Sequence, residues 1–206
     1  MNSNTTVLDV FINVRNAYRL LHDYQQMVID AVRYIGSQFD IPEWASQSAF
    51  AGDALSSYRY LKQSAWDWLP MMSAVFHFTK PISGTGHLSL SILVVSDTGF
   101  VKGDGGKDVE TTSTFDQVED SKTQFAFFLY QSPPHRFLQD LFTPSQLHEF
   151  LRNGIDIGPS VTGRLYDAQC LCSEGQLNEV IKDIVNSAQK QNLPLELRKS
   201  PINSDT

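Results

Sequence analysis

The nine residues "HLSLSILVV", from His87 to Val95, decide the fold of this chain. Apolar side chains alternate there with small polar ones, and a period of two is typical of a β-strand. One face would carry Leu88, Leu90, Ile92 and Val94, and the other would carry Ser89 and Ser91. The turn sequences "PISGTG" and "SDTG" lie before and after the stretch, which therefore predicts a strand between two tight turns.

The segments on either side of this strand also have strand character. Residues 72–79 alternate, with Phe76 and Phe78 on one face and His77 on the other. The stretch "TQFAFFLYQ", residues 123–131, is apolar on both faces, which is typical of a central strand. A fourth strand is expected within residues 160–172. Short turns between consecutive strands favour an antiparallel meander.

Helical patterns lie before and after these strands. The N-terminal residues 1–36 predict one long amphipathic helix, in which apolar residues recur at alternating steps of four and three, and which Gly36 would end. A short helix is expected over residues 52–66. Pro144 would open a later helix that Gly154 ends. The last helix would start at a capping box formed by Ser173 and Gln176.

These elements predict a single α+β domain over residues 1–206. Its core would be an antiparallel sheet of about four to five strands, with helices packed on it and the long N-terminal helix at its start. Residues 37–51 read as a loop around Pro42, and residues 102–122 as a polar loop with several glycines and acidic side chains. We expect residues 198–206 to form a flexible tail.

The bulk composition narrows the function classes. The formal net charge of −7 argues against electrostatic binding of nucleic acid, which needs a basic face. No apolar run approaches the length of a membrane helix, and the N-terminus lacks a signal-peptide pattern. Only two cysteines are present, Cys170 and Cys172, which are expected on one strand face. We therefore expect a cytoplasmic protein with no membrane association, no cofactor and no metal site.

An aromatic pocket is the first candidate site. Trp66, Trp68 and His77 stand close in sequence around Pro70 and could line a pocket for a planar ligand, as in a small-molecule sensor. The alternative, which we favour, is that the two tryptophans anchor the joint between helix and strand against the core. In that interpretation His77 faces solvent or a neighbouring helix.

A second candidate depends on element order and on three residues. Asp97 follows one predicted strand, and Asp120 and Lys122 form a D-x-K spacing ahead of the next. A helix, three meandering strands, a helix and a strand is an order that resembles the PD-(D/E)XK nuclease superfamily. The resemblance implies a magnesium-dependent nuclease with these three residues as its catalytic set. The sequence departs from that pattern because the second acid and the lysine should lie within the strand.

The long helix suggests the interpretation that we prefer. Its apolar face is broader than contact with one sheet requires, and exposed apolar faces of that size mark interfaces. The expected interface residues are Val10, Val14, Ala17, Leu21, Tyr24 and Val28. We expect a non-enzymatic interaction or regulatory module, acting as a homodimer or as a subunit of a larger complex with another protein. The alternative for this face is burial within the chain's own core.

Overall fold

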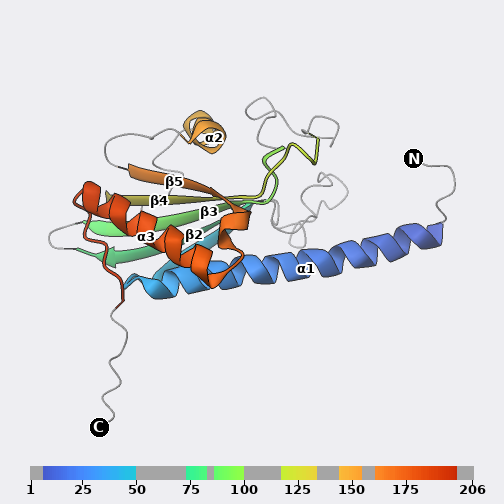
Figure 1. Ribbon diagram of the computed structural model, residues 1–206, viewed down its shortest axis with the longest axis horizontal. Helices are drawn as coiled ribbons and strands as arrows, with labels where there is room; N and C mark the ends of the chain where they lie inside the picture. The colour runs from blue at the N-terminus through green and yellow to red at the C-terminus, as the bar shows by residue number, and fades with distance from the viewer. Residues whose placement is uncertain are drawn as a thin grey trace, which may run out of the picture.

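The computed structural model describes residues 7–49, 73–82, 86–99, 117–133, 144–154 and 161–198. The elements in chain order are α1 (Val7–Gln38), β1 (Glu43–Ala49), β2 (Ser73–Pro81), β3 (His87–Val95), β4 (Gln124–Ser132), α2 (Pro144–Asn153), β5 (Val161–Asp167), a 3-10 turn (Ala168–Leu171) and α3 (Glu174–Lys190) (Figure 1). The predicted α+β class, with its antiparallel sheet and long N-terminal helix, is confirmed.

The sheet is an antiparallel meander in the order β1-β2-β3-β4-β5. β3 lies at its centre, where Ser91 pairs with His77 of β2 and with Phe128 of β4. The predicted loop over residues 37–51 is wrong, because α1 extends to Gln38 and β1 pairs antiparallel with β2. The sequence of β1 has no clear alternation, so its strand conformation comes from pairing with the edge of β2.

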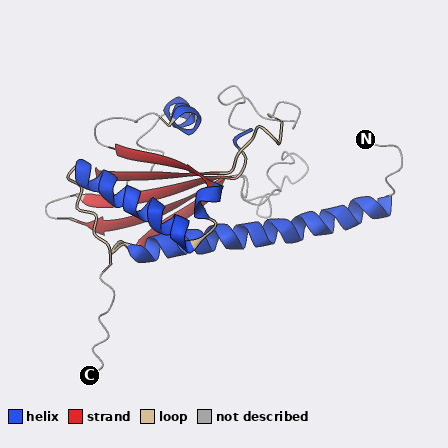
Figure 2. Cartoon of the chain, viewed as in Figure 1, coloured by secondary structure: helices blue, strands red, loops and turns tan. Residues whose placement is uncertain are grey.

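One face of the sheet packs against α1 and α3 (Figure 2). From α1 this core takes Val28, Ala31, Val32 and Ile35, and from α3 it takes Leu177, Val180, Ile181, Ile184 and Ala188. The sheet contributes apolar side chains of β2, β3 and β4, including Phe78, Ile92 and Phe127. Each large apolar side chain buried in this way stabilises the fold by about 1.5–3 kcal/mol.

The opposite face of the sheet carries a second, smaller core. Phe150 and Leu151 of α2 pack there with Phe128 of β4. The ring centroids of Phe128 and Phe150 lie 5.0 Å apart. Gly163 of β5 leaves room for the Phe150 side chain, since a Cβ atom at Gly163 would lie 2.5 Å from the Phe150 ring. The two cores make β3 and β4 the buried centre of the domain, as their apolar sequences predict.

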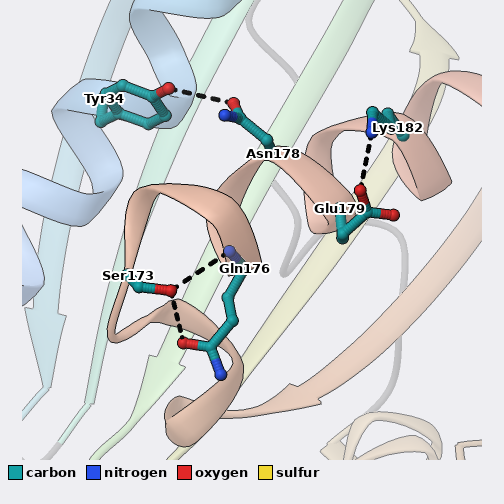
Figure 3. Close-up of polar contacts among 6 residues, drawn as sticks. All are labelled: Tyr34, Ser173, Gln176, Asn178, Glu179 and Lys182. Carbon is teal, nitrogen blue, oxygen red and sulfur yellow. Dashed lines mark hydrogen bonds and ion pairs between the residues drawn. The ribbon is translucent and has the colours of Figure 1, made fainter.

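The predicted helix boundaries hold at three places and fail at one. α2 begins at Pro144 and is followed by Gly154 with a φ of 64°. The Ser173 hydroxyl caps α3 by accepting a hydrogen bond of 3.3 Å from the backbone N–H of Gln176 (Figure 3). Gly36, however, does not end the first helix. It lies inside α1, where its lack of a side chain lets the helix approach Phe78 of β2.

The predicted strand over residues 160–172 is also too long. β5 stops at Asp167, and the 3-10 turn follows it. Cys170 therefore lies in that turn and Cys172 just beyond it, so the two thiols do not share a strand face. Within the described residues, no helix has an apolar stretch that could cross a membrane.

Candidate functional site

The N-terminal half of α1 extends beyond the body of the domain (Figure 1). Every residue from Asp9 to Leu20 is exposed, although many of these side chains are apolar. Val10, Val14 and Tyr18 are 48%, 44% and 59% exposed, and Phe11 and Leu20 are exposed as well. We call residues 9–21 of α1 the projecting half. A run of exposed apolar side chains on one helix is unusual for a surface that faces only water.

The exposed side chains continue the face that α1 buries further along. Apolar residues recur at alternating steps of four and three, at Val10, Val14, Ala17, Leu21, Tyr24, Val28, Ala31 and Ile35. This spacing is the a/d pattern of a coiled coil, which keeps one seam along one side of a helix. The last three of these residues are buried and the first three are exposed. We call this line of residues the α1 seam.

Tyr24 marks the point where the seam reaches the body of the domain. Its hydroxyl donates a hydrogen bond of 2.9 Å to Ser96 Oγ, just after β3. Burial raises the pKa of the Tyr24 phenol, and the hydrogen bond with Ser96 opposes that rise. Leu21 is half-buried, and Val28 is only 1% exposed, within the chain's own core. Of the expected interface residues, Val28 is therefore buried away from any partner, and Tyr24 holds α1 to the rest of its own chain through the bond with Ser96.

The projecting half carries few charges near its seam. Arg15 and Arg19 lie away from the seam on the exposed surface, and Asp9 lies in the first turn. Phe11, Tyr18 and Leu20 flank the seam and add exposed apolar surface. A surface of this kind can pack against another apolar helix without first removing water from ionised groups.

A buried polar chain crosses the sheet at His77, the described member of the predicted aromatic pocket. His77 Nδ1 lies 2.8 Å from Ser91 Oγ, and Ser91 Oγ lies 3.1 Å from the Tyr130 hydroxyl. The three residues come from β2, β3 and β4, and His77 is only 3% exposed. Burial lowers the pKa of His77, which favours the neutral imidazole.

His77 is buried and therefore does not face solvent, which was one of the two positions that the favoured interpretation allowed; the other, beside a neighbouring helix, stays a prediction. Trp66 and Trp68 lie outside the described residues, so the aromatic pocket and the structural role of the two indoles remain predictions. The partner residues Ser91 and Tyr130 were not singled out from the sequence. The signal was available, because a serine in a strand that is otherwise apolar must find a hydrogen-bond partner when buried.

The three nuclease candidates lie on neighbouring segments, because the backbone of Lys122 forms hydrogen bonds of 2.9 Å with Thr98, the residue after Asp97. Asp97 Oδ1 accepts a hydrogen bond of 2.8 Å from the backbone N–H of Gly99. Lys122 Nζ donates to Asp167 Oδ2 at 3.1 Å, while Asp120 lies exposed in a turn. In the part of the chain that the structure describes, no three His, Cys, Asp or Glu side chains gather as metal ligands would.

A cluster of polar groups joins β5 to α3. The Tyr166 hydroxyl donates a hydrogen bond to Asp183 Oδ2, and Arg164 Nε lies 3.5 Å from the same oxygen. Burial raises the pKa of the Tyr166 phenol, and the nearby Asp183 carboxylate raises it further. Since the Tyr166 ring also packs edge-on against Phe127 of the core, the cluster fixes α3 on the sheet.

A groove of about 690 Å³ lies beside the C-terminal end of α1. Val32, Phe76 and Phe78 form part of its apolar lining, and Arg33 and Arg198 add charge. Arg33 Nη1 lies 3.6 Å from Asp30 Oδ1, and the backbone N–H of Arg198 donates to Gln38 O at 2.7 Å. The groove has room for a small ligand, but the described side chains around it form no constellation with an evident chemistry.

The chain belongs to the PM0109 family, whose model matches residues 4–192. The matched range includes all the described helices and strands, so the α1 seam lies within the family's domain. Searches of curated proteins and of solved structures returned no match.

Proposed function

We propose that this member of the PM0109 family is a non-enzymatic interaction module of the cytoplasm, which acts as a homodimer joined through the projecting half of α1. One observation carries the proposal: the apolar seam of α1 is buried from Val28 onward and uncovered from Val10 to Ala17. The cytoplasm is proposed because the chain has only two cysteines, both of them free.

The energetics favour a partner for this half of the helix. In proteins, packing of an apolar face supplies most of the stability of a helix. The projecting half is 13 residues long, from 9 to 21, and carries that face without a described neighbour. A second copy of the chain would bring the same surface, and two-fold dimers are the commonest assemblies of soluble proteins.

Light scattering coupled to size-exclusion chromatography tests the proposal on the full chain. We expect the wild type to elute with the mass of a dimer and to shift toward the monomer on dilution. Ala17→Glu places a charge on the exposed part of the seam and should weaken dimerisation at least tenfold, because an unpaired carboxylate in an apolar interface costs more than about 1.4 kcal/mol.

Asn16→Glu is the matched control, because Asn16 is the next residue along the same exposed turn but lies outside the seam. It should leave the dimer intact. Neither site is buried, so both variants should keep the wild-type circular dichroism spectrum and melting temperature when measured at monomer concentrations. A wild type that stays monomeric at every concentration would contradict the homodimer and leave the seam for a different protein, as in a subunit of a larger complex.

A further inference from the structure

We infer that the two copies pair with their α1 helices antiparallel, so that Val14 faces the partner's Ala17 and Val10 faces the partner's Leu21. The inference rests on the proposed homodimer and adds its geometry. It follows from two observations: the seam is continuous along α1, and the chain's own sheet covers the seam from Val28 onward.

A parallel pair conflicts with the fold. In a parallel two-fold dimer the two seams face each other along the whole helix, including the turns from Val28 to Ile35. Those turns already face the chain's own sheet, through Phe78 and Ile92 among other residues. Paired helices lie only about 8–10 Å apart, so each domain would occupy the space of the other. A parallel pair would therefore require α1 to bend sharply or to leave its own core.

An antiparallel pair avoids this conflict. The two projecting halves would overlap side by side over about 18 Å, since a helix rises 1.5 Å per residue. Each domain body would then lie beyond the N-terminal end of the partner's α1, with the two bodies at opposite ends (compare Figure 1). Tyr24 and Ser96 lie where the seam reaches the body of the domain, so they mark the end of the overlap between the two projecting halves.

The exposed seam is self-complementary in this register. A two-fold axis between Val14 and Ala17 places each residue opposite one residue of the partner helix. The two residue numbers of every such pair add up to 31. The medium-sized Val14 then meets the small Ala17, and the large Leu21 meets Val10. Pairing large with small side chains is what lets apolar layers interlock at the density of a protein core. The charged residues Arg15 and Arg19 lie outside the contact, where water still reaches them.

Cysteine cross-linking of the full-length protein tests this register. Cys170→Ala and Cys172→Ser first remove the native thiols, and the background must form the same dimer as the wild type. Two chains with different tags are then co-expressed, one with Val10→Cys and the other with Leu21→Cys. Mild oxidation should link most of the mixed dimers. Either variant alone should stay unlinked, because in this register the two equivalent cysteines lie about 16 Å apart along the axis.

Ile12→Cys with Arg19→Cys is the matched control. These two positions also sum to 31 and so lie at the same height in the pair, but on the outer side of each helix. They should not link. If Val10→Cys links efficiently to itself, the helices are parallel and the inference is overturned while the homodimer survives. A stable dimer in which neither pair links would likewise overturn it, and a monomeric wild type would remove the proposed function with it.

Discussion

The ring of Phe78 lies so close to Gly36 that a Cβ atom added to Gly36 would be 2.5 Å from Phe78 Cε1. Gly36 is inside α1, where glycine is ordinarily less favourable than alanine by about 0.5–1 kcal/mol. Here the missing side chain sets the distance between α1 and β2. The glycine is therefore explained by packing between the helix and the sheet and not by the end of the helix.

We predict that Gly36→Ala lowers the free energy of unfolding by about 1–3 kcal/mol, since overpacking a core outweighs the gain in helix propensity. Gly175→Ala in α3 is the control, because no atom outside its own stretch of helix lies within 4 Å of the position of its added Cβ. It should be neutral or stabilise the protein by up to about 1 kcal/mol. Urea denaturation measures both. A gain in stability from Gly36→Ala would mean that Phe78 moves aside at little cost.

Ser91→Ala removes the hydroxyl that joins His77 to Tyr130 across three strands. We expect a loss of about 1–3 kcal/mol, because two buried polar groups lose a shared hydrogen-bond partner. A double-mutant cycle with Tyr130→Phe isolates the coupling between Ser91 and Tyr130, which should exceed about 0.5 kcal/mol. Ser37→Ala, at an exposed hydroxyl on α1, should have little effect. Strictly additive losses would show that the two hydroxyls act independently.

Acidification should destabilise the fold through His77. Burial lowers the pKa of His77 below its ordinary value of 6.5, so the unfolded chain binds the proton more readily than the folded one. The contribution of neutral His77 to the free energy of unfolding is complete above pH 6.5, and it is lost as the pH falls through the folded-state pKa. We expect the wild type to lose more stability between about pH 7.5 and about pH 5.5 than His77→Gln, which does not titrate there. Equal pH dependence of the two proteins would rule out this role.

Tyr166→Phe tests the cluster that joins β5 to α3. The substitution keeps the ring against Phe127 and removes only the hydrogen bond to Asp183. We expect the free energy of unfolding to fall by about 1–2 kcal/mol. This is less than the most that a hydrogen bond to a charged acceptor contributes, because Asp183 is partly exposed. Tyr34→Phe should cost less, because it removes a hydrogen bond of 3.0 Å to the neutral amide oxygen of Asn178 and only a long, exposed one of 3.4 Å to Glu174. The reverse ranking in thermal denaturation would contradict this account of the cluster.

The features that could be predicted from the sequence are those with a strong local pattern. The alternation in β3, the apolar run of β4 and the capping box at Ser173 each correspond to an observed element. β1 and the early end of β5 could not be predicted, because pairing with β2 and the turn after Asp167 depend on contacts distant in sequence. The wide apolar face of α1 could be predicted from the sequence. The point along the helix where the chain's own sheet stops covering that face could not be predicted.

The position of that point, near Tyr24, divides α1 into two parts with different amide protection. The core holds the second part through Val28, Ala31, Val32 and Ile35, so we expect the backbone amides from Val28 to Ile35 to exchange mainly through global unfolding. Every residue from Asp9 to Leu20 is exposed, so in an isolated copy we expect these amides to exchange by fraying from the N-terminal end. A single helix thus joins backbone of high and of low protection, and a partner that covers the seam would reduce the difference between the two parts.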